Sequence, residues 1–94
     1  VENAGAFAVV IEGVKEDLAR EIAEKISIPV IGIGAGRYVD GQVLVWSDML
    51  GFFEDFKPKF VKQYLQGAKS TKNAVQQFAD EVRNGLFPET ENIY

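Results

Sequence analysis

The sequence contains neither cysteine nor histidine, and these two absences narrow its possible chemistry. Without cysteine the chain forms no disulfide bonds and offers no thiolate ligands to a metal. Without histidine it has no serine–histidine triad, no histidine zinc site and not the commonest general base. Any acid–base chemistry must therefore come from Glu, Asp, Lys or Tyr.

The chain is also poor in positive charge and in long apolar runs. Ten Lys and Arg residues face fourteen Asp and Glu residues, which gives a formal net charge of −4 at pH 7. This balance argues against nucleic-acid binding, because phosphate contacts need clustered cations. No apolar run approaches the roughly 20 residues that span a bilayer, and no signal-peptide pattern opens the chain. We therefore expect a cytoplasmic protein that binds neither nucleic acid nor membrane.

What is present is an ordinary globular composition, with 47% hydrophobic and 26% charged residues. A length of 94 residues suits one small domain with an adequate core. The chain opens at Val1 without an initiator Met, and residues 1–4 followed by Gly5 are typical of a helix end with a glycine terminator. We interpret the sequence as one that enters a fold midway.

The first third of the chain predicts a parallel βαβ unit. Residues 6–11 are apolar without alternation, which favours a strand buried on both faces over the competing interpretation, a buried helix. Residues 15–26 repeat apolar side chains at spacings of three and four, with acids in the first turn, which predicts an amphipathic helix. Pro29 ends this pattern and residues 30–33 begin a second buried strand. A strand, helix and strand in this order are expected to be parallel.

A third strand and a helical C-terminal half follow. Residues 42–46 predict a short strand, although the preceding glycine-rich stretch contains no helix, so a parallel return would be unusually compact. The remaining patterns predict a helix over 59–66 opened by Pro58, a helix over 71–84 capped by Thr71, and an extended tail over 86–94.

Glu12 is the strongest candidate for chemistry. It ends an otherwise apolar strand, and α/β folds place catalytic groups at the carboxyl ends of their strands. A carboxylate that apolar neighbours partly desolvate there is suited to act as a general base. A solvated strand-end charge, or a charge that interacts with the N-terminus of the next helix, stays open as the alternative.

The glycine-rich run at 32–36 is a second candidate. Its glycines could cradle a phosphate or let a ligand approach the backbone closely. The run is not a dinucleotide fingerprint, because Arg37 stands where a third glycine is needed. It also lacks the Lys-Ser/Thr ending of a P-loop. A tight turn without a ligand explains the run equally well.

Val43 and Val45 should point to one side of their strand, because side chains alternate along a strand. Together with Ile33 they could form an apolar wall beside Glu12, and ordinary sheet core is the alternative.

The remaining polar and aromatic groups carry weaker signals. Asp40 and Asp48 lack a second carboxylate at a ligand-like spacing, so we predict no metal site, and Asp40-Gly41 is typical of a turn. Two side-chain groups are expected to be structural: a solvated helix face of Lys57, Lys59 and Lys62, and an aromatic cluster of Trp46, Phe52, Phe53 and Phe56 that serves core packing or a subunit contact.

Several motifs together resemble the C-terminal part of the ketopantoate hydroxymethyltransferase (3-methyl-2-oxobutanoate hydroxymethyltransferase) family. They are Val-Ile-Glu-Gly-Val at 10–14, Ile-Pro-Val-Ile-Gly-Ile-Gly-Ala-Gly at 28–36, Asp-Gly-Gln-Val-Leu-Val-Trp at 40–46, Asp-Met-Leu-Gly at 48–51 and Pro-Lys-Phe-Val-Lys at 58–62. The resemblance covers nearly the whole chain. Ser47 and the tail at 91–94 depart from the family pattern, which puts pocket detail and oligomer contacts in doubt.

The resemblance implies an α/β fold, namely the last three strands and following helices of a (β/α)8 TIM barrel. A whole barrel takes about 250 residues, so residues 1–94 would be the C-terminal portion of a single barrel domain. The family assembles into a decamer. It transfers a one-carbon unit from 5,10-methylenetetrahydrofolate to 3-methyl-2-oxobutanoate, which makes ketopantoate (2-dehydropantoate) for pantothenate and coenzyme A synthesis.

The resemblance also implies roles for residues of this chain. Glu12 falls on the general base that removes the C3 proton of the keto acid and gives an Mg²⁺-stabilised enolate, and Ile33, Val43 and Val45 fall on positions that line the apolar end of the substrate. The Mg²⁺ ligands belong to the N-terminal part of the barrel, so we expect the isolated chain to be inactive. The alternative function is a non-catalytic half-barrel module that binds a phosphorylated ligand or a partner subunit through the glycine-rich run.

Overall fold

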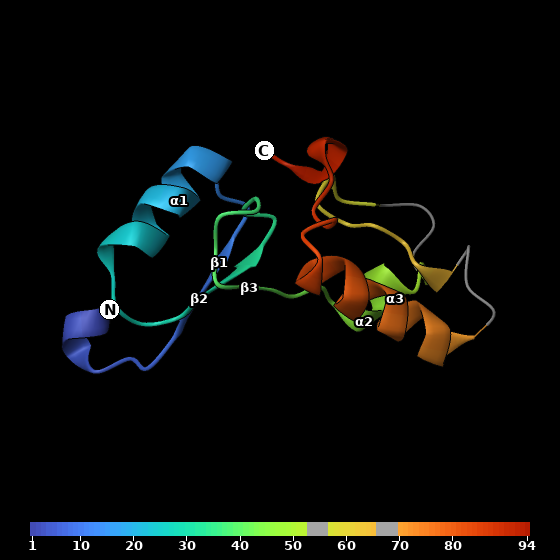
Figure 1. Cartoon of the computed structure of the whole chain (residues 1–94), viewed down its shortest axis with the longest axis horizontal. Coiled ribbons are helices and arrows are strands. Elements are labelled where there is room, and N and C mark those ends of the chain that lie inside the picture. Colours follow the sequence, from blue (N-terminus) through green and yellow to red (C-terminus); the bar gives the residue numbers. More distant parts are fainter. Residues whose placement is uncertain (53–56, 66–69) are drawn as a thin grey trace.

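A computed structural model of the chain describes residues 1–52, 57–65 and 70–94. The molecule is elongated, with principal extents of 44 × 22 × 22 Å. Figure 1 shows a half that contains the strands and α1, and a second half that contains α2 and α3. The chain crosses between these halves directly after β3, and the C-terminal tail returns toward the gap between them.

The N-terminal helices and strand agree closely with those predicted from the sequence. A 3-10 helix, η1 (Glu2–Ala4), ends at Gly5 with a φ of 100°, which confirms the predicted helix end with a glycine terminator. The first strand, β1, spans Val9–Glu12 and so begins three residues later than predicted. The predicted amphipathic helix is α1 (Glu16–Lys25), with two acids in its first turn and Lys25 in its last.

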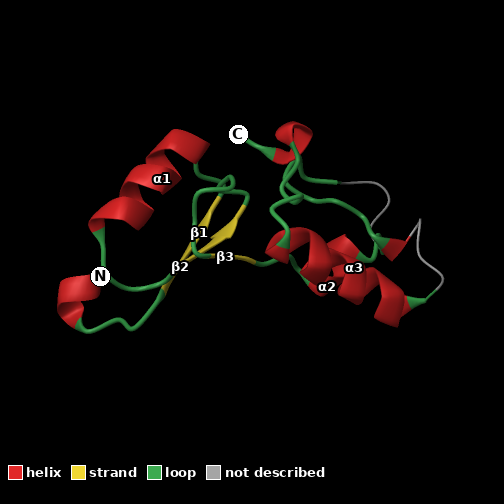
Figure 2. Cartoon of the chain, in the orientation of Figure 1, coloured by secondary structure: helices red, strands yellow, loops and turns green. Residues whose placement is uncertain are grey.

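The strands form one parallel sheet in the order β1-β2-β3 (Figure 2). The central strand β2 (Val30–Ile33) pairs with β1 so that Glu12 lies beside Ile33. It pairs with β3 (Gly41–Gln42) so that Gly32 lies beside Gln42. The predicted parallel α/β arrangement is therefore confirmed for this chain.

The third strand is shorter than predicted, and Asp40 explains how it returns without a helix. Its backbone N–H donates to the Val30 carbonyl over 2.9 Å, while its carboxylate accepts from the Val30 N–H over 2.8 Å. Gly41 fits beside the second residue of β2 because a Cβ there would lie 3.0 Å from Ile31 Cδ1. The strand predicted over 42–46 is wrong at its end, since α2 (Trp46–Met49) begins at Trp46.

The prediction that the first strand is buried on both faces is wrong. Burial alternates along β1, and Val10 is 63% exposed. Val9 lies with Ile22 and Ile26 of α1 around one apolar cavity, so α1 covers that face only. The opposite face, which carries Val10 and Glu12, is open to solvent.

The predicted helix over 59–66 is also wrong for the residues that the structure describes. No helix occupies 57–64, and Gln66 lies outside the described residues. The Tyr64 N–H donates instead to the Met49 carbonyl over 2.8 Å, which ties this segment to α2. Val61 and Tyr64 are 1% and 2% exposed, so the segment supplies core residues without forming a helix over 57–64.

The last helix, α3 (Thr71–Arg83), agrees with the prediction apart from its cap. Ser70 rather than Thr71 is the N-cap, because its hydroxyl accepts from the Asn73 N–H over 3.2 Å. The tail is not simply extended, since it contains the 3-10 helix η3 (Thr90–Asn92).

A hydrophobic core joins the two halves of the molecule. Tyr64 and Phe87 are buried in it and the partly buried Phe78 packs against them, with ring centroids 5.7–6.2 Å apart in edge-on geometry. The other buried members of this core are Ile33, Leu44, Met49, Leu50, Val61 and Ala74. Ile33 brings the carboxyl end of β2 into contact with this core. Of the helices that the structure describes, none has both the length and the apolarity needed to cross a membrane.

We predict that Asp40→Ala destabilises the sheet by about 1–3 kcal/mol, because the Val30 N–H loses a charged acceptor in a partly buried position. Urea unfolding should show this loss. Asp40→Asn is the matched control, since its amide oxygen can still accept, and it should lose less than half as much. Equal losses for the two variants would contradict the role assigned to the hydrogen bond.

Candidate functional site

The sheet register brings three of the predicted site residues into one row. Glu12 and Ile33 are direct partners, and Val43 follows Gln42, which is the partner of Gly32. The row is held by hydrogen bonds from the Gly13 N–H to the Ile33 carbonyl and from the Val43 N–H to the Gly32 carbonyl, both 3.0 Å. Residues paired in register point to the same face of a sheet. Glu12 and Ile33 therefore share one face at the carboxyl ends of their strands, and Val43 lies one residue beyond the end of β3, next in register beside them.

The members of this row differ in accessibility. Glu12 is exposed, and no described residue hydrogen bonds to its carboxylate, so apolar neighbours within this chain do not desolvate it. Val43 and Val45 are 39% and 48% exposed, and Val45 lies one step beyond the row, directly before α2. Ile33 is only 8% exposed and belongs to the core. Of the three predicted apolar wall residues, Val43 and Val45 are therefore the two that a ligand could reach.

The glycine-rich run forms a tight loop that protein atoms already fill. Gly34 and Gly36 have φ values of +69° and +80°. A Cβ at Gly34 would lie 2.7 Å from Phe60 Cδ1, and a Cβ at Gly36 would lie 2.5 Å from Glu16 Cγ. Both glycines are buried. The absence of side chains therefore lets Phe60 and Glu16 approach the loop backbone.

The side chain of Glu16 packs on Gly36, and its carboxylate binds Arg37 at the end of this loop. It accepts from the Arg37 backbone N–H over 2.9 Å and from Arg37 Nε over 3.2 Å. Burial acts to raise the pKa of Glu16, but the hydrogen bonds and charge of Arg37 outweigh it and lower that pKa. A phosphate here would have to displace this carboxylate, so these contacts do not favour the phosphate-binding alternative.

The Asp-Gly-Gln sequence at 40–42 makes hydrogen bonds to both ends of the segment from β2 through the glycine-rich loop. Gln42 Nε2 donates to the Gly36 carbonyl over 2.7 Å, and Asp40 holds Val30 as described above. The described residues contain no group of three or more Asp, Glu, His or Cys side chains that could hold a metal ion. The hydrogen bonds that Asp40 makes are to the backbone of Val30, at the start of β2.

Two further expectations from the sequence need correction. Trp46 and Phe52 form an edge-on pair with centroids 5.4 Å apart, but they are 63% and 57% exposed, so core packing does not explain them. Phe53 and Phe56 lie outside the described residues. Lys62 is not part of a solvated helix face, because it is half-buried and forms ion pairs with Glu81 and Glu89.

Sequence reasoning did not single out Phe60, Glu16 or Asn92 as partners of the site. The positive φ of Gly34 and Gly36 requires glycine on its own, so the sequence could not indicate that a side chain also packs there. Asn92 stands in a polar tail with no periodic pattern to mark it as buried.

A parallel βαβ unit with a carboxylate and apolar side chains at the carboxyl ends of its strands is typical of the ligand-binding edge of an α/β enzyme. Comparison with known proteins specifies the family. The family model described as ketopantoate hydroxymethyltransferase matches residues 1–90, and the chain belongs to this family.

Curated relatives agree along the whole chain. The 3-methyl-2-oxobutanoate hydroxymethyltransferases of a Nitratiruptor species, Aliarcobacter butzleri and Helicobacter pylori are 63%, 60% and 53% identical over 94 residues. These residues are 100% of this chain but only 35–36% of each relative. The chain therefore spans about a third of the length of the relatives that it matches.

We predict that Gly34→Ala costs more stability than Gly13→Ala. Both positions have similar positive φ values, +69° and +64°, so both variants carry the left-handed penalty of about 1–2 kcal/mol. Only at Gly34 does the new Cβ meet a side chain, that of Phe60, which adds about 1–3 kcal/mol. Denaturant unfolding of both variants measures the difference, and equal losses would contradict the close contact.

The lowered pKa of Glu16 predicts a specific dependence of stability on pH. A carboxylate whose pKa falls below its usual 4.5 on folding stabilises the protein above that value. This contribution is lost as the pH falls through the lower, folded-state pKa. The free energies of unfolding of the wild type and Glu16→Gln should therefore differ at neutral pH and converge as the pH is lowered below 4.5. A difference that stays constant across this range would contradict the Glu16–Arg37 interaction.

Proposed function

We propose that this chain is the C-terminal part of a (β/α)8 barrel that acts as a 3-methyl-2-oxobutanoate hydroxymethyltransferase. In this proposal the enzyme transfers a one-carbon unit from 5,10-methylenetetrahydrofolate to 3-methyl-2-oxobutanoate and forms ketopantoate. The family match over residues 1–90 and the three parallel strands support it. The observation that carries it is the row of Glu12, Ile33 and Val43 at the carboxyl ends of those strands.

Glu12 is the general base in this proposal. Its carboxylate takes the C3 proton of the keto acid, and the electron pair of that C–H bond forms the C2=C3 double bond of an enolate. C3 of the enolate then forms a bond to the methylene carbon, and the two bonds from that carbon to folate nitrogens break. Water supplies the hydroxyl group of the product, and its remaining proton and the proton held by Glu12 go to the two folate nitrogens. The product gains CH₂OH while the donor gives only CH₂, so the overall reaction consumes one water. With no histidine in the chain, Glu12 is the titratable side chain that this row offers for the proton transfer.

Val43 and Val45 form the wall against the apolar end of the substrate, and Ile33 supports this wall from the core. Their side chains suit the two methyl groups at C3 of 3-methyl-2-oxobutanoate, because branched aliphatic groups exclude water from the carbon that becomes a carbanion. The partial exposure of both valines leaves this surface free to receive a ligand.

The rest of the barrel is the proposed partner of this chain. The open sheet face that carries Val10 and Glu12 would become the interior of the barrel, where Glu12 would lose part of its solvation. The described residues do not form a magnesium site. If the family's Mg²⁺ is bound, its ligands come from that other part, and no step assigned to this chain depends on it. Assembly into a homo-oligomer, a decamer in the family, belongs to the same proposal.

A composite enzyme tests the function directly. This chain replaces the 94 matching residues of the Nitratiruptor relative, with which it is 63% identical. The composite should convert 3-methyl-2-oxobutanoate in the presence of the folate donor, while the 94-residue chain alone should not. A composite that folds and assembles as the relative does, but lacks turnover, would overturn the proposal.

We predict that Glu12→Gln in the composite enzyme lowers kcat by about 10²–10⁴-fold, the usual size of a general-base contribution. The amide keeps the size of the side chain but cannot take the proton. Glu24→Gln, at an exposed position on α1 that forms an ion pair with Arg20, is the matched control and should leave kcat within about two-fold of the composite. Steady-state kinetics with the keto acid decides. Activity within two-fold in Glu12→Gln would show that another group is the base.

A further inference from the structure

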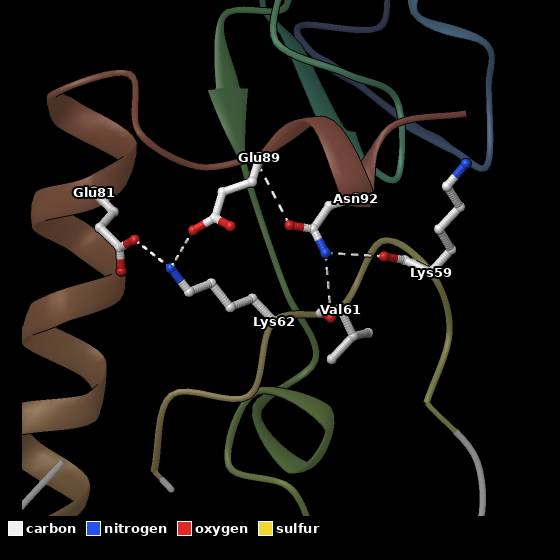
Figure 3. A network of polar contacts seen from close by, with 6 residues as sticks. All are labelled: Lys59, Val61, Lys62, Glu81, Glu89 and Asn92. Atoms are coloured by element: carbon white, nitrogen blue, oxygen red, sulfur yellow. Dashed lines mark hydrogen bonds and ion pairs between the residues drawn. The ribbon is translucent and has the colours of Figure 1, made fainter. Parts of the chain in front are cut away.

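The C-terminal tail is fastened to the segment before α3 by a buried side-chain amide. Asn92 is only 4% exposed. Its Nδ2 donates to the carbonyls of Lys59, over 2.9 Å, and Val61, over 3.4 Å, and its Oδ1 accepts from the Glu89 N–H over 3.3 Å (Figure 3). Both polar atoms of the amide are thus used, which offsets the cost of burying them.

A second fastening lies beside the first. Lys62 Nζ lies 2.6 Å from a carboxylate oxygen of Glu81 on α3 and 2.6 Å from one of Glu89 in the tail (Figure 3). Burial acts to lower the pKa of Lys62, but the two carboxylates outweigh it and raise that pKa. The ammonium group therefore stays charged and holds the tail and α3 together.

The fastened segment reaches the glycine-rich loop through Phe60. This residue stands between Lys59 and Val61, whose carbonyls accept from Asn92, and its ring lies 6.3 Å from that of Tyr94. On its other side Phe60 packs on Gly34 so closely that a Cβ there would be 2.7 Å away. A narrow crevice is lined jointly by the loop, Phe60 and Asn92.

We propose that the tail, residues 89–94, holds Phe60 against Gly34 and thereby fixes the loop beside the row of Glu12 and Ile33. Asn92 is a positioning residue in this arrangement, since it touches neither the row nor its open face. A tail that only covered the surface would need no buried amide with every polar atom paired. An effect of the tail on the KM for the keto acid rests on the proposed function, whereas its effect on the amide hydrogen exchange of the loop does not.

Asn92→Asp in the composite enzyme tests this. The carboxylate has the same shape, but it cannot donate to the Lys59 and Val61 carbonyls and repels them. Amide hydrogen exchange over residues 34–37 should become about 5- to 100-fold faster, with exchange over β2 unchanged. The KM for the keto acid should rise by about 3- to 10-fold, with kcat changed less. Asn73→Asp, at an exposed position of α3, is the matched control and should change neither.

Phe60→Ala provides a second, independent variant. It removes the Cγ and Cδ1 atoms that pack on Gly34 but leaves the Asn92 hydrogen bonds to the Lys59 and Val61 carbonyls in place, so exchange should speed up over 34–37 and not over 89–94. If either variant leaves 34–37 unchanged, or speeds exchange equally along the whole chain, the proposal is wrong. The exchange measurement does not need turnover. If Glu12 is not the general base, the exchange result is unaffected. If exchange over 34–37 does not change, the kcat test of Glu12 is likewise unaffected.

Discussion

The parallel pairing of β2 on both sides is the constraint on which the rest of the structure depends. Side chains alternate along a strand. A register shift of one residue against β1 would therefore place Ile33 beside Ile11 or Gly13, and Glu12 and Ile33 would no longer share one face. The start of β2 is fixed by the two hydrogen bonds between Val30 and Asp40. Its end is fixed where Ile33 enters the core. The position of Glu12 relative to the valines follows from these anchors.

The glycine-rich loop is best understood as a joint between the two halves of the molecule. On one side it receives the Glu16 carboxylate from the start of α1, and on the other it receives the Phe60 ring from the helical half. Glycine is needed there for two separate reasons, the positive φ and the lack of space for a Cβ. The loop therefore transmits the position of the C-terminal half to the carboxyl ends of the strands.

The sequence predicts those parts of the fold that local patterns determine. Residues 30–33 and α1 agree because their apolar spacing is set within a few residues of chain. The helix predicted from Lys59 onward is wrong because the Tyr64 N–H finds its acceptor at Met49, outside the segment, and no propensity records such a bond. The same holds for the site, where the strand patterns indicate Glu12 and the valines. The burial of Asn92 depends instead on Lys59 and Val61, which lie 33 and 31 positions earlier in the chain.

The half-open sheet has a practical consequence for anyone who produces this segment. Among the described strands, β1 pairs on one side only, and it presents Val10 at 63% exposure close to Phe7 at 89%. A free strand edge with apolar neighbours is a template for other extended chains, so we expect this chain on its own to self-associate as its concentration rises. In the barrel proposed above, a neighbouring strand would pair with that edge of β1 and remove the template.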